Sequence, residues 1–308
     1  MNNVRIAVEV CVACVFTLLS ACASAADATV PGTTRVAQWK DDKKAAFLLM
    51  FDDSMPSHIK NVVPELKKRG MIATFYVNPG KGEWRAFKDV WEKQIPADGM
   101  EYGNHTFTHQ GVRDFEHAEE EIGKCNDVIL SVFPDRKKPR LISFGVPGVK
   151  PGAWNINAAQ LAQILEKLHL VERPKFDGHG AAIHQKTADD MLRLAEKALA
   201  SGGVEHIVFH GVGGEWISVP LTVFIPFLDG LAKKSDQLWI TDHMSAHKYE
   251  TERSSAEARV LSADEKQIRL SLTCKAAPEL YDQPLTLVTQ VPSSWQKVQI
   301  SQAPQKSI

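Results

Sequence analysis

The chain has 308 residues, with 36 Lys and Arg against 37 Asp and Glu, and therefore a formal net charge of −1. This balance argues against a nucleic-acid-binding protein, which usually carries a basic excess or a basic stripe. Hydrophobic residues make up 44% and charged residues 24% of the chain, a globular composition that excludes a wholly disordered or fibrous protein. The length allows one large domain, alone or with a smaller one.

The first 26 residues are interpreted as an export signal that lies outside the fold. Arg5 precedes an apolar run, Ile6–Leu19, that is too short and too interrupted for a membrane span. Two processing sites compete: residues 23–25 (Ala-Ser-Ala) form a small-residue cleavage site, and residues 19–22 resemble the bacterial lipobox, in which Cys22 would carry a lipid. Both predict export to the periplasm, the cell envelope or the medium, with a membrane attachment only through Cys22.

Residues 35–250 alternate between predicted strands and helices. The apolar run Ala45–Phe51 is typical of a strand buried on both faces, and the amphipathic helix Ser57–Arg69 and a strand over Met71–Val77 complete a βαβ unit. The further expected strands are Met100–Gly103, Arg140–Phe144, His169–Glu172, His206–His210 and Leu238–Thr241, and the further expected helices are Phe115–Phe133, Ile156–Leu168, Thr187–Ser201 and Leu221–Lys234. About seven such units predict an α/β barrel, with an open doubly wound sheet as the alternative.

The pattern changes after residue 250. Residues 250–257 are polar and linker-like, and residues 257–308 then alternate apolar and polar side chains, as in Ile268–Cys274, Leu285–Val291 and a third stretch from Val298. This period of two predicts a small antiparallel β unit. Its role has two interpretations: it packs on the barrel, or it helps to hold a glycan or an envelope partner.

Two adjacent acids, Asp52 and Asp53, follow the first buried strand directly. Acids are costly to place there unless they have ionic partners. One interpretation is a helix cap made by Asp53 or Ser54. The other is catalytic, because strand-end acids at the carboxyl face of a barrel commonly act in chemistry.

Histidines spaced four residues apart occur three times in this chain. His105 and His109 follow the third strand, and on a helical turn both imidazoles would reach one metal. The other pairs are His206/His210, too far apart on a strand to chelate one ion, and His243/His247, which is the rival. Together with Asp53, the first pair would supply three ligands and leave one position open, as in a catalytic zinc site. Asp52 would then be a base.

His210 ends another apolar strand and enters a Gly-rich loop that leads to Trp216. This position suits a general acid, and the alternative is a core histidine that binds a backbone carbonyl. No Lys-Ser/Thr follows the glycines, so they form no phosphate loop. Trp216 is placed to stack on a sugar ring, or else it packs in the core.

Together and in this order, these residues resemble the polysaccharide deacetylase family, the fourth carbohydrate esterase family. The resemblance rests on Phe51-Asp52-Asp53, on the His-Thr-x-x-His of residues 105–109, and on the strand that ends at His210. It implies a distorted (β/α)7–8 barrel and a divalent metal, usually zinc. It further implies Asp53, His105 and His109 as metal ligands, Asp52 as the catalytic base, and His210 as the acid.

The chain departs from the family pattern at several positions. The third motif, around Phe144 and Pro147, lacks the arginine that orients the base in the family, and Arg140 lies slightly upstream of it. Asp177 is the candidate for the acid of the fourth motif that supports His210. Trp216, Phe144 and Asp177 are the candidate substrate contacts.

The resemblance implies a hydrolase that removes N-acetyl, or O-acetyl, groups from a carbohydrate polymer or oligosaccharide. Two alternatives stay open. One is a catalytically degenerate carbohydrate-binding protein on the same barrel, which the altered third motif favours. The other is a metal-dependent hydrolase of a different amide or ester.

Overall fold

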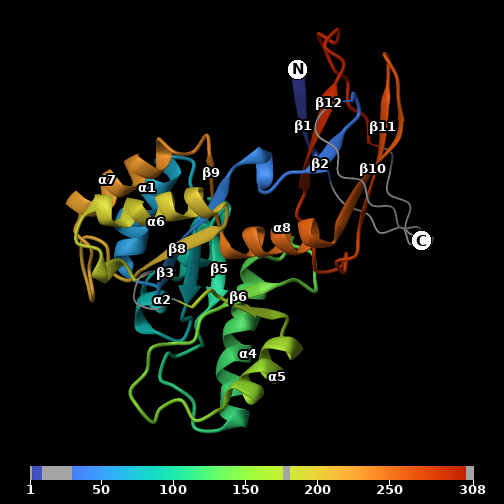
Figure 1. Ribbon diagram of the computed structural model, residues 1–308. Coiled ribbons are helices and arrows are strands. Elements are labelled where there is room, and N and C mark those ends of the chain that lie inside the picture. The colour runs from blue at the N-terminus through green and yellow to red at the C-terminus, as the bar shows by residue number, and fades with distance from the viewer. Residues whose placement is uncertain (1, 9–29, 176–180, 303–308) are drawn as a thin grey trace. The chain divides into compact units, whose positions relative to one another are not determined.

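The computed structural model describes residues 2–8, 30–175 and 181–302 (Figure 1). The chain divides into two compact units. One comprises residues 44–246, and the other comprises residues 1–43 together with residues 247–308. None of the helices in the described ranges is both long and apolar enough to cross a membrane.

The larger unit is built on a parallel sheet of seven strands. These strands are β3 (Ala45–Asp52), β4 (Thr74–Val77), β5 (Glu101–Asn104), β6 (Ile142–Phe144), β7 (Leu170–Glu172), β8 (Val204–Phe209) and β9 (Leu238–Thr241). They pair in the order β7-β6-β5-β4-β3-β8, and β9 pairs with the first half of β3, beside the stretch that pairs with β4. Ala181 adds a parallel bridge to Val208 of β8. The expected α/β fold, a distorted (β/α)7–8 barrel, is thereby confirmed, and its parallel sheet is a curled half-barrel with β7 and β8 at the two ends of the strand order.

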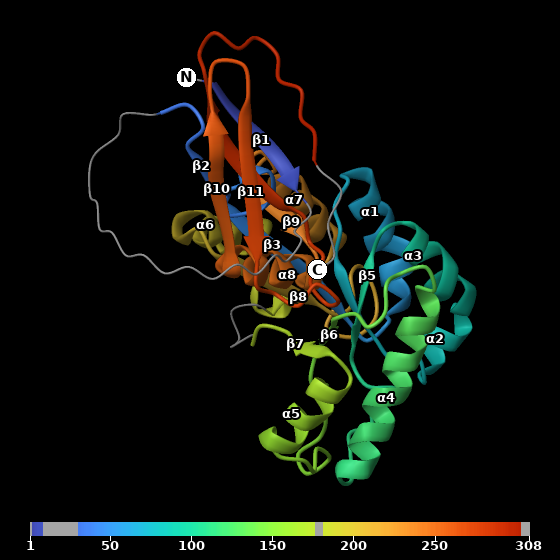
Figure 2. The ribbon, with the colours of Figure 1, turned by 90° about the vertical axis from the view of Figure 1, so that its right-hand side faces the viewer.

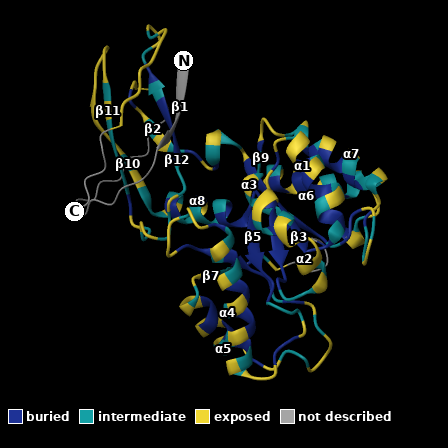
Figure 3. Cartoon of the chain, turned by 180° about the vertical axis from the view of Figure 1, so that it is seen from behind, coloured by how far each residue is buried: buried dark blue, intermediate teal, exposed yellow. Residues whose placement is uncertain are grey.

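Helices follow most of these strands and bury one face each. They are α1 (Val63–Lys68), α2 (Gly82–Ala86), α3 (Ile95–Ala97), α4 (Phe115–Val132), α5 (Ala158–Lys167), α6 (Ala188–Ser201) and α7 (Leu221–Ala232). Short turns of other helix types are η1 (Lys40–Asp42), η2 (His58–Val62), η3 (Val90–Gln94) and η4 (Ala182–His184). The side chains of Asp114, Asn157 and Thr187 cap α4, α5 and α6. In Figure 3 the sheet is dark blue and the helices are yellow on their outer faces.

The alternation of β3 decides where the site lies. Every residue of this strand is buried. Phe47, Leu49 and Phe51 pack into the main core, whereas Leu48 and Met50 pack into a second cluster with Tyr76, Val208 and Ala246. Because side chains alternate along a strand, Asp52 belongs to the same row as Leu48 and Met50, at the carboxyl end of the sheet.

The smaller unit is mostly antiparallel. The strands β1 (Asn2–Val8), β12 (Leu285–Val291) and β2 (Thr34–Val36) form one sheet, and β10 (Ala256–Ala263) and β11 (Ile268–Cys274) form a hairpin, seen side by side in Figure 2. Helix α8 (His243–Ser255) leads into β10. Within this unit the Tyr249 hydroxyl donates to the carbonyl of Ala37.

Three sequence-based expectations concern residues of this unit. The polar segment expected as a linker is instead the end of α8 and the beginning of β10. The expected strands over Ile268–Cys274 and Leu285–Val291 are present, whereas the stretch from Val298 is not a strand. Part of the expected export signal forms β1, and Cys22 lies outside the described residues. A strand at this position does not test whether the segment is removed, so the signal stays a prediction.

Candidate metal centre and active site

The turn after β3 presents the two acids. Asp53 and Ser54 have φ angles of 78° and 52°, a left-handed conformation that non-glycine residues adopt rarely. The backbone is held there because the amide of Asp53 donates to the carbonyl of Tyr76 at 3.1 Å and Ser54 Oγ accepts from the amide of Asn78 at 3.0 Å. Ser54 is therefore bonded to the neighbouring strand end and does not cap the following helix.

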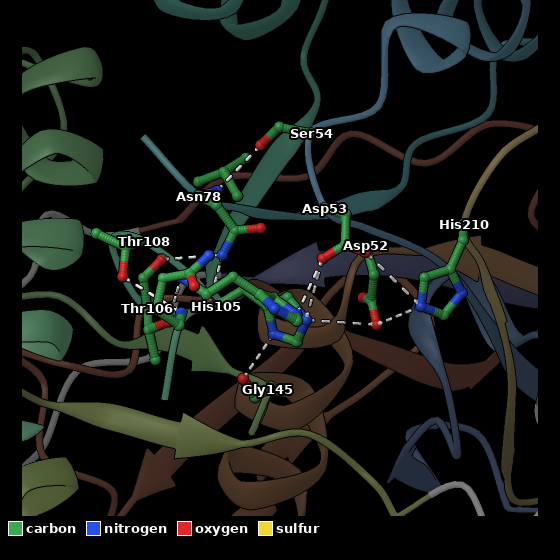
Figure 4. Close-up of polar contacts among 12 residues, drawn as sticks. Asp52, Asp53, Ser54, Asn78, His105, Thr106, Thr108, Gly145 and His210 are labelled. Atoms are coloured by element: carbon green, nitrogen blue, oxygen red, sulfur yellow. Dashed lines mark hydrogen bonds and ion pairs between the residues drawn. The ribbon is translucent and has the colours of Figure 1, made fainter. Parts of the chain in front are cut away.

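The two histidines lie on the loop after β5. This loop is not the helical turn assumed from their spacing, because Thr106 and His109 have φ angles of 64° and 61°. The two left-handed residues fold the loop back and bring the imidazole centroids of His105 and His109 to 5.0 Å. Asn78 Nδ2 donates to the carbonyls of His105 and Thr106, so Asn78 joins this loop to the turn that carries the acids (Figure 4).

Helix α4 holds the same loop from the other side. A single carboxylate oxygen of Glu121 accepts from both the amide and the hydroxyl of Thr108, each at 2.8 Å. The amide of Phe107 donates to the carbonyl of Glu121. Glu121 is buried, and its hydrogen bonds to Phe107 and Thr108 hold the backbone between the two histidines in place.

Asp53, His105 and His109 form a group that fits a divalent cation. One potential ligand atom from each lies within 4.8 Å of the other two. His109 Nε2 is 3.1 Å and His105 Nε2 is 3.9 Å from Asp53 Oδ1, and this buried oxygen has no hydrogen-bond partner. A buried carboxylate oxygen without a partner is costly. A cation bound between Asp53, His105 and His109 would give this oxygen a partner. The His109 side chain is 18% exposed, which gives the group access to solvent.

The protonation state of His105 also suits a metal ligand. Its Nδ1 lies 2.7 Å from the carbonyl of Gly145 (Figure 4), and because a carbonyl only accepts, Nδ1 is the protonated nitrogen. Burial, partly offset by the charges of Asp52 and Asp53, lowers the pKa of His105 to about 4. At neutral pH the ring is therefore neutral, and the Nε2 lone pair faces Asp53. A histidine that binds a metal through one ring nitrogen usually donates a hydrogen bond from the other, as Nδ1 of His105 does here.

Arg173 binds Asp52 with both terminal nitrogens, at 2.6 and 2.9 Å. Burial alone would raise the pKa of Asp52, but the charge of Arg173, with smaller contributions from His105 and His210, holds that pKa well below its usual range. The carboxylate is therefore ionised. The Arg173 guanidinium also lies 4.4 Å from the centroid of the Tyr76 ring.

Sequence reasoning missed Arg173. It follows β7 directly, so the strand-end rule that found Asp52 and His210 could have identified it. The arginine expected near the third motif, Arg140, instead binds Glu101 at 2.6 Å, at the amino end of β5.

His210 follows β8 and faces both acids. Its Nε2 is 4.0 Å from Asp52 Oδ2 and 4.0 Å from Asp53 Oδ2, and its side chain is 20% exposed. The Trp216 ring lies 5.3 Å from the His210 ring, at 89° to it. Trp216 is 62% exposed, so it does not pack in the core.

The remaining candidates lie elsewhere. Phe144 is fully buried in the main core, which corrects the expectation that its side chain contacts substrate. Asp177 lies outside the described residues. His243 is buried, with Nδ1 2.7 Å from Ser143 Oγ, and in the described part of the chain Asp53, His105 and His109 are the one group found with metal-binding spacing.

Comparison with known proteins identifies a family for part of the chain. Residues 40–166 match the family model described as polysaccharide deacetylase, which confirms the resemblance drawn from the motifs. The match contains both acids and both loop histidines, and it ends before Arg173 and His210. A gellan lyase from a Bacillus species is 23% identical over 88% of this chain, and the chain spans only 12% of that protein's length.

Three solved structures are similar at low identity. The family 4 carbohydrate esterase of Streptomyces lividans has a TM-score of 0.47 at 18% identity, covering 64% of this chain and 92% of that one. The peptidoglycan deacetylase PdaC of Bacillus subtilis scores 0.41 at 18% identity, with 66% and 90% covered. A family 4 pseudoenzyme of Bacillus anthracis scores 0.46 at 17% identity, with 67% and 66% covered. Likeness at this level says nothing about activity or substrate.

Proposed function

We propose that this divergent member of the polysaccharide deacetylase family is a metal-dependent hydrolase that removes acetyl groups from a carbohydrate, N-acetyl first among them. The observation that carries the proposal is the buried Asp53 Oδ1, which lacks a hydrogen-bond partner and faces two imidazole nitrogens. An ionised Asp52 and a partly exposed His210 stand beside it. Hydrolysis can use all of these polar groups, whereas tight packing of the protein interior requires none of them.

Asp53, His105 and His109 would hold the cation, for which the donor set of one carboxylate and two imidazoles favours zinc. When bound, such a cation polarises a carbonyl oxygen and lowers the pKa of a water molecule. Solvent reaches this position past the partly exposed side chains of His109 and His210.

Asp52 would act as the base that accepts a proton from the attacking water. Its two oxygens are oriented by the Arg173 fork, and Oδ2 also faces the Nε2 atoms of His105 and His210 at 3.7 and 4.0 Å. His210 would donate a proton to the departing amine, which is otherwise a poor leaving group. Because His210 Nε2 and Asp52 Oδ2 are 4.0 Å apart, both groups can contact one bound substrate, as general acid–base catalysis requires.

Two substitutions test these roles. Asp52→Asn and His210→Ala should each retain the metal and lose turnover by about 10²–10⁴-fold. Metal content by elemental analysis and acetate release from an acetylated oligosaccharide panel are the measurements. A rate near that of the wild type in either variant would remove the role assigned to that residue.

The carbohydrate assignment draws on the family and on Trp216. The matching family model is described as polysaccharide deacetylase, and an exposed indole beside the acid offers a flat surface for a sugar ring. The degenerate-binder alternative rested on the missing third-motif arginine, and Arg173 occupies that place beside Asp52. Hydrolysis of another amide or ester is separated by the same substrate panel.

We also propose export of the protein, from the pattern of residues 1–26. The mass of the mature protein purified from its native host tests this. Cleavage near Ala25, or before a lipidated Cys22, supports export, whereas an intact amino terminus contradicts it.

A further inference from the structure

Ser57 and the η2 turn that follows it are hydrogen-bonded to residues 210–212, directly after β8. Ser57 Oγ accepts from the amide of Val212 at 3.1 Å, and Asn61 Nδ2 donates to the carbonyl of Val212 at 2.7 Å. His58 Nε2 lies 2.7 Å from the carbonyl of His210 itself. Three successive contacts thus join the chain just after Asp52 and Asp53 to the segment just after β8.

His58 has an unusual environment for a histidine. It is fully buried, and its ring centroid lies 5.4 Å from that of Phe51, 5.6 Å from Phe75 and 6.4 Å from Trp91. Burial, only partly offset by the bond to the His210 carbonyl, lowers the pKa of His58 to about 4, so the ring is neutral at neutral pH. Because a carbonyl only accepts, the proton is on Nε2, and the buried Nδ1 has no hydrogen-bond partner.

An apolar ring would therefore suit this aromatic setting better than an imidazole does. A buried nitrogen without a partner costs free energy, and the one hydrogen bond of the His58 side chain is the one to the His210 carbonyl. The presence of an imidazole here is explained by that bond and not by packing.

Backbone hydrogen bonds and one close backbone contact fix the shape of the loop beyond His210. The amide of Gly211 donates to the carbonyl of Trp216 at 3.1 Å, and Val212 forms a bridge with Val219. A Cβ on Gly211 would lie 2.1 Å from the carbonyl oxygen of Gly214, so no side chain fits there. Holding the backbone at residues 210–212 consequently places both the His210 imidazole and the Trp216 ring.

We propose that His58 is a positioning residue, whose Nε2–H fixes the carbonyl of His210 and so aims the His210 imidazole at Asp52 and Asp53. The proposal rests on the proposed function, because it assigns His58 a role through the acid. Displacing a reacting group by about 1 Å can cost about 10²-fold in rate. Loss of the bond should therefore reduce kcat far more than KM.

Two substitutions at residue 58 separate positioning from packing. His58→Phe keeps an aromatic ring and removes the donor, and we expect unchanged or higher thermal stability with kcat reduced about 10–100-fold. His58→Gln keeps an N–H donor and loses the ring, and we expect lower stability with kcat several-fold above that of His58→Phe. A purely structural role predicts the opposite ranking of kcat.

Tyr102→Phe is the matched control. The Tyr102 hydroxyl donates to the backbone carbonyl of Trp91 in the same aromatic cluster, so its removal also deletes a buried bond from a side chain to a carbonyl. We expect reduced stability with unchanged kcat. Wild-type kcat in folded His58→Phe, or no recovery in His58→Gln, would overturn the proposal.

Two further measurements do not depend on turnover. Nitrogen-15 NMR should show His58 as the Nε2–H tautomer at pH 7. Hydrogen exchange at the amide of Val212, which donates to Ser57 Oγ, should be faster in His58→Phe than in the wild type and unchanged in Tyr102→Phe. An Nδ1–H tautomer or unchanged exchange would overturn the positioning role even in an active enzyme. Absence of acetate release by the wild type, with both measurements as expected, would instead overturn the proposed function.

Discussion

The two ends of the parallel sheet each contain a buried carboxylate bound by arginine. At the carboxyl end Arg173 binds Asp52 through two bonds of 2.6 and 2.9 Å. At the amino end Glu101 accepts from Arg140 at 2.6 Å and from Arg136. Both arginines at the amino end lie over the Phe133 ring, at 4.1 and 5.0 Å from its centroid.

The difference between the two ends lies in what surrounds the pair. Three imidazole rings, of His105, His109 and His210, stand near Asp52 and Asp53, and one oxygen of Asp53 is left without a hydrogen bond. Glu101 instead has both of its oxygens bonded to arginines, and those two arginines pack against the Phe133 ring. A buried ion pair alone therefore does not identify a functional site, whereas a buried acid with an unbonded oxygen beside several imidazoles does.

The largest effect is expected from removing a ligand at the carboxyl end. His105→Ala should lose the metal and reduce acetate release by at least about 10³-fold, because catalysis by a polarised carbonyl and an activated water depends on the cation. The control is His247→Asn, from the rival pair, which should keep both metal and activity. A His105→Ala protein that retains stoichiometric metal would place the ion elsewhere.

Replacing arginine by lysine at each end of the sheet should distinguish the catalytic ion pair from the structural one. Arg173→Lys keeps the charge and loses the planar fork, so we expect kcat to fall about 10–100-fold through misorientation of Asp52. Arg140→Lys should cost about 1–2 kcal/mol of unfolding free energy and leave kcat unchanged. Chemical denaturation and steady-state kinetics measure the two effects. Equal loss of activity in both variants would contradict the functional distinction between the ends.

The buried imidazole of His58 should give the protein a pH-dependent stability. Its pKa is about 4 in the folded chain and about 6.5 when unfolded. Between these values the unfolded chain binds the extra proton, so unfolding free energy falls as the pH falls from 6.5 to 4. Between pH 7 and pH 5 the His58→Phe protein should lose about 2 kcal/mol less than the wild type. Urea titrations at the two pH values measure this, and parallel losses in both proteins would contradict it.

The smallest effect is expected at the exposed aromatic residue. Trp216 is open to solvent, whereas Phe133 is covered by arginines. Trp216→Ala should raise KM for an oligosaccharide about 5–10-fold with little change in kcat, because the substrate loses a stacking interaction worth about 1 kcal/mol of binding free energy. Phe133→Leu should affect stability alone. An unchanged KM would remove Trp216 from the substrate site.

The sequence predicted those parts of the molecule that depend on local patterns. The buried run that became β3 and the capped, amphipathic α4, α5 and α6 were all expected. The acids and both loop histidines were found because they follow strand ends. Polar residues 250–257 were misjudged as a linker because a helix end and an edge strand expose polar side chains equally well.

The contacts made across the fold could not be read from the sequence. Arg173 is 121 residues from Asp52, and only the parallel order of the strands brings them together. The His105–His109 loop obtains its shape from Asn78 and Glu121, on other elements. The role of His58 likewise depends on a carbonyl 152 residues away.

The central claim, that Asp53, His105 and His109 close around one cation, is tested most directly by calorimetric titration of the metal-free protein with Zn²⁺. The account predicts one ion per chain in the wild type, with an affinity at least about 10²-fold lower in Asp53→Ala and in His109→Ala, since each loses one of three ligands. The absence of binding, or an affinity that neither substitution changes, would contradict it.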